Sequence, residues 1–315
     1  MRVFTMLPMQ HWREVGPFAA AVEGAGFDTL MTVELAHDPF APLAIAALAT
    51  ARIELTPSIA VAFPRSPTIM ASQAWDLQAN SNGRFVLGLG SQVRGHNERR
   101  FGIAWSPPAP RLRDYVRALR AIWRCWETGE KLDYRGEHYK LTLMTPDFSP
   151  EPTGLPMVPV TIAAVGGAML RVAGEVCDGV RLHPLCSRRY VEEVALPRLA
   201  DGMGRSGRSR ANFDVFGGGF VVTDPIKKPS PKVWSGSASA SLSMARRAAT
   251  CRSWHCTGST SSGRNCMLCL SRGTGTRWPP RSRTRSCAFS RHAALMTKSP
   301  GRSMSGSAAL PTRSK

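Results

Sequence analysis

The alternation of short apolar, strand-like runs with helix-like runs across residues 2–223 constrains the fold of this chain more than any other feature. The clearest helix-like run has apolar side chains at three- and four-residue steps from Leu112 to Trp126, the period of an amphipathic helix. Strands that alternate with helices form a parallel sheet. Seven strands are predicted, at residues 2–7, 28–34, 53–62, 84–90, 158–165, 178–183 and 213–223.

Six strand–helix pairs and a seventh strand exceed a small doubly wound domain and predict a (β/α)8 TIM barrel, a fold of about 250 residues. The last helix, the eighth strand and the eighth helix are then expected beyond residue 224, where the alternation stops. We therefore expect a barrel that is incomplete at its C-terminus, with these elements missing or replaced. Without an eighth strand, the first and seventh strands keep open edges.

Acidic residues stop at the same place. Residues 225–315 hold 17 Lys and Arg but no Asp or Glu, so the first 224 residues hold the other 41 − 17 = 24 basic residues and all 22 acidic ones. The formal charge of +19 is thus +2 over residues 1–224 and +17 over residues 225–315. Two regions are predicted: a partial barrel domain over 1–224 and a basic, low-complexity tail over 225–315.

Three interpretations of residues 225–315 stay open. The segment could be disordered, because it has few apolar residues to bury. It could bind nucleic acid non-specifically through its charge. It could be a frame-shifted translation, since a GC-rich gene read in the wrong frame gives Arg, Ser, Cys and Trp without acids. A zinc site is a weaker option, because the first cysteine pair has the spacing C-x4-C; its ligands would come from Cys251, His255, Cys256, Cys266 and Cys269.

The N-terminal region predicts neither a membrane span nor export. No run of about 18 apolar residues occurs, and the apolar stretch after Met1 is too short for a signal peptide. Cys125, Cys177 and Cys186 are scattered, which suggests buried thiols in a reducing compartment, and so a cytoplasmic protein. Residues 1–224 contain no HExxH, CxxC, GxSxG or P-loop motif, so no metal is expected there.

Polar or glycine residues follow five consecutive predicted strands, at the ends where barrel enzymes bind ligands. Each has a structural alternative: the glycines allow tight turns, the histidines could be satisfied structural groups, and the carboxylates could cap helices or face solvent. The glycine pair after the fifth strand opens a helix, whose free N–H groups could bind phosphate. The candidates are Glu34, His37, Ser58, Ile59, Gly90, Ser91, Gln92, His96, Ala164, Gly166, Gly167 and His183.

Five strings of residues resemble the bacterial-luciferase-like family of flavin- and deazaflavin-dependent oxidoreductases and monooxygenases. They are EGAGFD at 23–28, HDPF at 37–40, AFPRSP at 62–67, GRFVLGLGSQ at 83–92 and AGEVCDG at 173–179. The likeness is greatest to an actinobacterial subgroup thought to use coenzyme F420, and it covers residues 1–224. It implies a barrel with a cofactor ring across the strand ends, either coenzyme F420 or, alternatively, FMN.

The resemblance also implies roles for the candidates. A non-proline cis peptide that supports the ring maps to Ser58–Ile59, and Gly166 and Gly167 would receive the cofactor phosphate. The remaining cofactor contacts are expected from the fourth and fifth strand ends: Gly90, Ser91, Gln92, His96 and Ala164.

The implied reaction is hydride transfer between the cofactor and a small organic substrate. His37 is the candidate for proton transfer, because its ordinary pKa lies near neutrality. Glu34 would orient His37 or hydrogen-bond the ring, and Arg65 would line the cofactor mouth or form an exposed salt bridge. Val93 stands where some sugar-oxidising relatives carry Glu, which argues against sugar phosphates. Relatives are often dimers, so a homodimer is expected. The alternative is a non-catalytic barrel fragment whose tail binds nucleic acid.

Overall fold

The structure is a computed structural model that describes residues 2–217. Its framework is a series of strands in which every pairing is parallel apart from one small hairpin. The parallel strands are β1 (Phe4–Met6), β2 (Thr29–Thr32), β3 (Glu54–Pro57), β4 (Ala60–Val61), β5 (Leu87–Gly90), β8 (Val160–Ala163), β9 (Gly179–Arg181) and β10 (Asp214–Phe216).

These strands form two sheets that meet at one strand of the barrel. The first sheet has the order β1-β2-β3 and the second the order β10-β9-β8-β5-β4. β3 and β4 are successive parts of one barrel strand, separated only by Ser58 and Ile59, and a bridge between Leu55 and Phe85 continues the pairing at their base. Seven consecutive barrel strands are therefore present in residues 2–217, as the alternation predicts.

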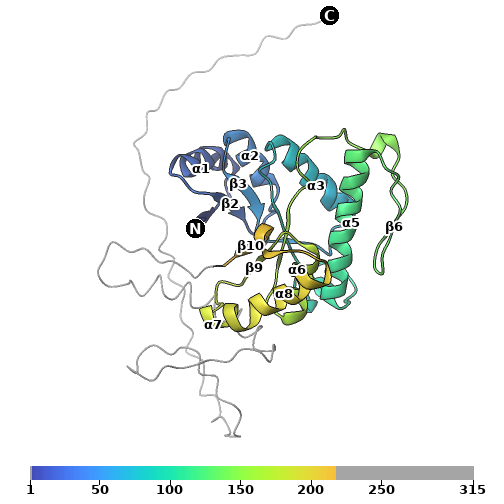
Figure 1. Cartoon of the computed structure of the whole chain (residues 1–315). Helices are drawn as coiled ribbons and strands as arrows, with labels where there is room; N and C mark the ends of the chain where they lie inside the picture. The colour runs from blue at the N-terminus through green and yellow to red at the C-terminus, as the bar shows by residue number, and fades with distance from the viewer. Residues whose placement is uncertain (1, 218–315) are drawn as a thin grey trace, which may run out of the picture. The chain divides into compact units, whose positions relative to one another are not determined.

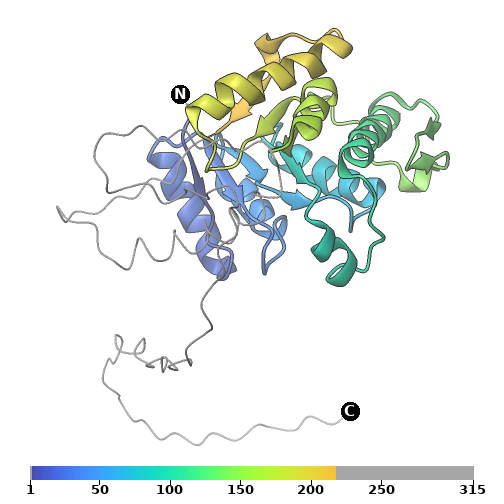
Figure 2. The ribbon, with the colours of Figure 1, turned by 90° about the horizontal axis from the view of Figure 1, so that it is seen from below.

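Helices follow the strands and lie outside them (Figure 1). Neighbouring helices pack together, α1 on α2, α3 on α5, and α5 and α8 on α6. Figure 2 shows the same arrangement from below. The helices are α1 (Trp12–Gly24), α2 (Ala41–Ala49), α3 (Pro67–Asn80), α4 (Arg94–Arg99), α5 (Pro108–Thr128), α6 (Gly167–Val176), α7 (Arg188–Tyr190) and α8 (Leu196–Arg205), with short helical turns η1 (Pro146–Phe148), η2 (Val191–Ala195) and η3 (Arg210–Asn212).

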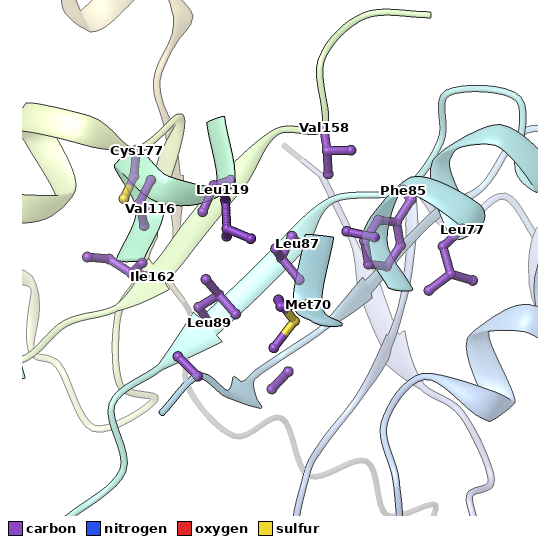
Figure 3. Packing of buried hydrophobic residues seen from close by; sticks show 14 of the residues in the cluster. Met70, Leu77, Phe85, Leu87, Leu89, Val116, Leu119, Val158, Ile162 and Cys177 are labelled. Carbon is purple, nitrogen blue, oxygen red and sulfur yellow. The ribbon is translucent and has the colours of Figure 1, made fainter. Parts of the chain in front are cut away.

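The alternating pattern of β5 explains where the core lies. Leu87 and Leu89 point outward and pack with Val116 and Leu119 of α5, and all four are fully buried (Figure 3). The intervening Gly88 faces the barrel interior, where an added Cβ would lie 2.0 Å from the carbonyl oxygen of Pro57. The layer between strands and helices is thus apolar, whereas the interior of the barrel has little room at this strand.

A hairpin, β6 (Tyr134–Arg135) with β7 (Lys140–Leu141), lies beyond α5 on the side away from the strands (Figures 1 and 2). Buried Asp114 of α5 fastens it by accepting hydrogen bonds from the Tyr134 hydroxyl and from the N–H groups of His138 and Tyr139. No helix in residues 2–217 is long and apolar enough to cross a membrane.

Some boundaries differ from the sequence prediction. Between α7 and α8 the chain forms a π-helical turn, η2, just before Pro197, whose missing N–H removes one helical hydrogen bond. Helix α4 was not predicted. β10 spans three residues, and the rest of the strand predicted at 213–223, from residue 218 on, lies outside the described residues.

The edges of the strand series are β1 and β10. Within residues 2–217 no strand pairs with either free edge, but the Arg2 guanidinium lies 3.3 Å from the Asp214 carboxylate and links their bases. Phe4 and Met6 of β1 are 40% and 46% exposed. The predictions for the eighth strand, the zinc ligands and the basic tail concern residues outside the described part of the chain.

Candidate functional site

The site begins at the break between β3 and β4, where the Ser58–Ile59 peptide bond is cis. Ser58 donates its N–H to the Thr32 carbonyl at 2.6 Å, which fixes the bulge against β2. The Ile59 side chain lies over Gly90 of β5, because a Cβ at Gly90 would be 2.4 Å from Ile59 Cδ1. The predicted cis bond is therefore confirmed, and the fold brings Ser58, Ile59 and Gly90 together at the C-terminal ends of neighbouring strands.

Glu34, after β2, holds the strand that follows the cis bond. Its Oε2 accepts the Val61 N–H at 2.6 Å and lies 2.8 Å from Arg65 Nη1. The same Nη1 donates to the Val61 carbonyl at 3.1 Å, and the guanidinium stacks 5.5 Å from the centre of the Phe40 ring. The side chains are only 9% exposed for Glu34 and 17% for Arg65, so this is a largely buried salt bridge.

Two further groups complete this support. The Tyr115 hydroxyl of α5 donates to the Arg65 carbonyl at 3.0 Å, and burial raises the Tyr115 pKa well above its ordinary value. The Asp38 carboxylate accepts the N–H groups of Phe40 and Ala41 at the start of α2 and lies 3.4 Å from Arg65. Asp38 thus binds free N–H groups at the start of α2, whose N-cap residue is Phe40.

His37 lies apart from Glu34. It is exposed and lines a pocket of about 450 Å³ at the ends of β1 and β2, together with a second histidine, His11. Among the described residues no hydrogen bond joins Glu34 to His37, since both Glu34 oxygens are engaged by Arg65. The other walls of the pocket are mostly apolar: Met6, Leu7, Pro8, Met9, Gln10, Val33, Leu35 and Ala36.

The loop after β5 places three further candidates. Gln92 has a left-handed backbone, with φ of 55°, and its side-chain oxygen accepts the Val93 N–H at 2.9 Å. Buried Asn97 of α4 donates to the Ser91 carbonyl at 2.9 Å and so holds the loop. His96 is half-buried one residue earlier on α4. Gly90, Ser91, Gln92 and His96 thus belong to one continuous segment beside the bulge.

The start of α6 is suited to an anion. Gly166 is the N-cap residue, the first turn contains no acidic side chain, and the first N–H groups of a helix have no acceptor within it. A Cβ on Gly167 would meet the Arg198 side chain at 3.6 Å, so a basic residue of α8 adjoins the glycine pair. Arg198 pairs with Asp201 at 3.2 Å. Ala164, just before, is buried and donates its N–H to the Arg181 carbonyl.

The structure adds residues that the sequence analysis did not select. His11 joins the pocket because it follows β1 directly, a signal available from the strand-end argument. Arg198 reaches Gly167 from a helix that follows the next strand, so no local pattern reveals it. His183, by contrast, is one of the candidates from the sequence; it lies after β9 and is half-buried, and burial lowers the pKa of its imidazole.

A second pocket of about 450 Å³ lies at the opposite, N-terminal ends of the strands. Its Asp178 is already engaged by Arg120 at 2.8 Å and Arg208 at 3.0 Å, and accepts the Val160 N–H. In barrel enzymes this face stabilises the fold, so the candidate site is the pocket at the C-terminal ends.

Comparison with known proteins identifies the family of this chain. The sequence profile described as Luciferase-like monooxygenase matches residues 1–226. The chain belongs to this family. The resemblance stated from five short strings is thereby confirmed.

Two curated relatives illustrate the match. An uncharacterised protein of Mycobacterium tuberculosis is 52% identical over 197 residues, which are 62% of this chain and 58% of the relative. A putative coenzyme F420-dependent oxidoreductase of the same organism is 31% identical over 217 residues, 64% of this chain and 60% of the relative. The chain thus spans about three fifths of the length of these relatives.

Solved structures confirm the fold. The coenzyme F420-dependent tetrahydromethanopterin reductase of Methanopyrus kandleri superposes with a TM-score of 0.55 at 23% identity, covering 69% of this chain and 64% of the reductase. The FMN complex of the oxygenating constituent of 3,6-diketocamphane monooxygenase, from Pseudomonas putida, gives a TM-score of 0.52 at 18% identity, with coverages of 68% and 66%. Residues 2–217 therefore carry the strands of a luciferase-like TIM barrel.

Proposed function

We propose that this protein is an oxidoreductase that transfers a hydride between coenzyme F420 and a small organic substrate, with FMN as the alternative cofactor. The observation that carries the proposal is the break of the third barrel strand at Ser58 and Ile59, where Ile59 packs on Gly90, at the ligand-binding ends of the strands in a chain of this family. The names of the Mycobacterium tuberculosis relative and the Methanopyrus kandleri structure favour coenzyme F420, whereas the Pseudomonas putida complex keeps FMN open.

The residues present fit such a cofactor. Gly166 and Gly167 offer backbone N–H groups for its phosphate, and Arg198 adds a positive charge beside them. Ser58, Ile59 and Gly90 form the surface on which a flat ring would rest. Ser91, Gln92, His96 and Ala164 are the neighbouring candidates. The bound cofactor would supply the hydride chemistry, and the protein would supply orientation and a proton.

The pocket lined by His37 and His11 is the place for the substrate. Its apolar walls, formed by residues such as Leu7 and Val33, would exclude water from the reacting atoms. An imidazole nitrogen of His37 would give a proton to the substrate oxygen, or accept one from it, because an imidazole ring can act as an acid or as a base. Glu34 would act at a distance, by keeping the β4 end of the bulge in place through Val61 and Arg65.

Cofactor binding is the first test. The full chain is titrated with coenzyme F420 and with FMN, and binding is followed by cofactor fluorescence. We expect saturable binding of coenzyme F420 and weaker binding of FMN. The reverse order would assign the site to FMN, and binding of neither would overturn the proposal.

The role of His37 is tested by His37→Ala. Removing a general acid or base lowers turnover by about 100-fold or more. The dissociation constant of the cofactor should stay within about threefold, because the imidazole acts on the substrate. Turnover is measured with small alcohols and ketones as hydride donors and acceptors. His11→Ala, in the same pocket, is the matched control. Equal losses of turnover in the two variants would contradict a specific role of His37 in proton transfer.

A further inference from the structure

A buried arginine lies inside the barrel, below the layer of strand ends. Arg181, the last residue of β9, is 7% exposed. Its Nε donates to Thr161 Oγ1 of β8 and its Nη2 donates to Thr56 Oγ1 of β3, both at 2.7 Å. The side chain therefore crosses the interior from β9 to β3, and two threonine hydroxyls fix the plane of its guanidinium.

This guanidinium has no carboxylate partner in residues 2–217. No ion pair within 4.0 Å involves Arg181, and its Nη1 makes no hydrogen bond there. Its nearest further contact is the face of the Phe216 ring, 4.3 Å away. Burial lowers the Arg181 pKa to about 10, so the group remains charged at neutral pH. Its direct hydrogen-bond partners are therefore neutral, and a buried cation without a carboxylate in direct contact is costly.

Other charges lie one level lower in the barrel. Arg2 pairs with Glu54 and with Asp214, at the bases of β1, β3 and β10. Glu54 and Asp214 raise the Arg181 pKa and Arg2 lowers it, but burial outweighs all three. Arg2 and Arg181 thus give two positive charges at the base of the barrel, against two negative charges from Glu54 and Asp214. Both carboxylates are already paired with Arg2.

Arg181 is connected to the bulge through β3. Thr56, which accepts from Nη2, is two residues before Ser58. A Cβ on Gly88 would lie 2.7 Å from Arg181 Nε and 2.0 Å from the Pro57 carbonyl oxygen, so the guanidinium and the residue before the cis bond meet over this glycine. The positive charge is thus held next to the backbone that supports the ring in the proposed function.

We propose that Arg181 is an electrostatic positioning residue that stabilises the reduced, negatively charged form of the bound cofactor relative to its oxidised form. The inference rests on the proposed function. When the substrate gives up a hydride, the ring gains two electrons and one proton, and hence one negative charge, while the substrate is oxidised. A fixed positive charge in a water-poor interior favours the side of this equilibrium with the extra negative charge.

The test compares affinities for the two redox forms of one cofactor. The dissociation constants of oxidised and reduced coenzyme F420 are measured for the wild-type chain, Arg181→Gln and Arg181→Lys. We expect the ratio of the oxidised to the reduced constant to fall about tenfold in Arg181→Gln. For a two-electron couple, this fold-change lowers the reduction potential of the bound cofactor by about 30 mV. A loss of packing alone would weaken the binding of both redox forms equally and leave the ratio of their dissociation constants unchanged.

Arg181→Lys keeps the charge, so its ratio should stay within about threefold of the wild-type value. Arg135→Gln, at an exposed salt bridge of the hairpin, is the control and should change nothing. An unchanged ratio in Arg181→Gln would overturn the inference, as would a tenfold fall in Arg181→Lys. If Arg181→Gln does not fold, Arg181→Lys still tests the inference, because a tenfold fall of its ratio would overturn it. If the wild-type chain binds neither redox form of coenzyme F420 or FMN, the proposed function itself fails.

Discussion

At the scale of single residues, Arg84 shows how one side chain joins a helix to the starts of two barrel strands. Its guanidinium donates to the carbonyls of Ala47, Thr50, Ile53 and Ser81, and also to the Thr50 hydroxyl. It therefore satisfies carbonyl groups at the end of α2 and joins them to the starts of β3 and β5.

Arg84→Met keeps most of the apolar stem of the side chain and removes every donor. We expect the free energy of unfolding to fall by about 3 kcal/mol, because several carbonyl groups lose their partners at once. Urea denaturation measures this change. Arg124→Met, on the exposed face of α5, is the control and should stay within about 0.5 kcal/mol of the wild-type value. Equal losses in the two variants would contradict the bridging role of Arg84.

Single residues were predicted from sequence when their role is local. Gly90 was identified because it stands in a contiguous string shared with a family, and the cis bond at Ser58–Ile59 was identified because the family resemblance implies such a bond in the third strand. Arg181 was not, since its partners Thr56 and Thr161 are far away in the chain and meet it only after the barrel forms. Glu34 was selected, but its partners Val61 and Arg65 were not foreseen.

At the scale of elements, the barrel strand divided into β3 and β4 depends on the Glu34–Arg65 pair. Glu34→Gln keeps a hydrogen-bond acceptor for Val61 but leaves the Arg65 guanidinium without its main charge partner. We expect a loss of about 2 kcal/mol in unfolding free energy, from a mostly buried pair.

The same change should weaken cofactor binding several-fold, because the bulge is less firmly held. Fluorescence titration and urea denaturation give the two values. Asp38→Asn, which removes a charge near Arg65 but keeps the oxygen that caps α2, is the matched control and should affect both values less. If Asp38→Asn weakens cofactor binding as much as Glu34→Gln does, the pair has no specific part in shaping the bulge.

Elements were predicted well where the period is long, as in α5, whose apolar period runs from Leu112 to Trp126. Short elements were not: α4 has six residues, several of them charged, and gives no amphipathic period. The break between β3 and β4 was not predicted from periodicity either, because residues 53–62 were assigned to a single strand. It became predictable only through the family resemblance.

At the scale of the whole molecule, the barrel follows from the alternation of strands and helices, since parallel strands need crossover helices. The outer edges of β1 and β10 have no strand partner within residues 2–217. The composition changes at residue 224: the formal charge is +2 over residues 1–224 and +17 over residues 225–315.

That charge predicts a salt-sensitive affinity for arbitrary DNA. If six phosphates are neutralised, affinity should fall by about 1,000-fold between 50 and 200 mM salt. Replacing Arg281, Arg283 and Arg285 by Ser should reduce the slope of log affinity against log salt by up to about 3, because each lost phosphate contact removes about 0.9. Replacing three exposed arginines of the barrel, Arg124, Arg135 and Arg189, is the matched control. Equal slopes for the two triple variants would show that the charge of residues 225–315 does not govern DNA binding.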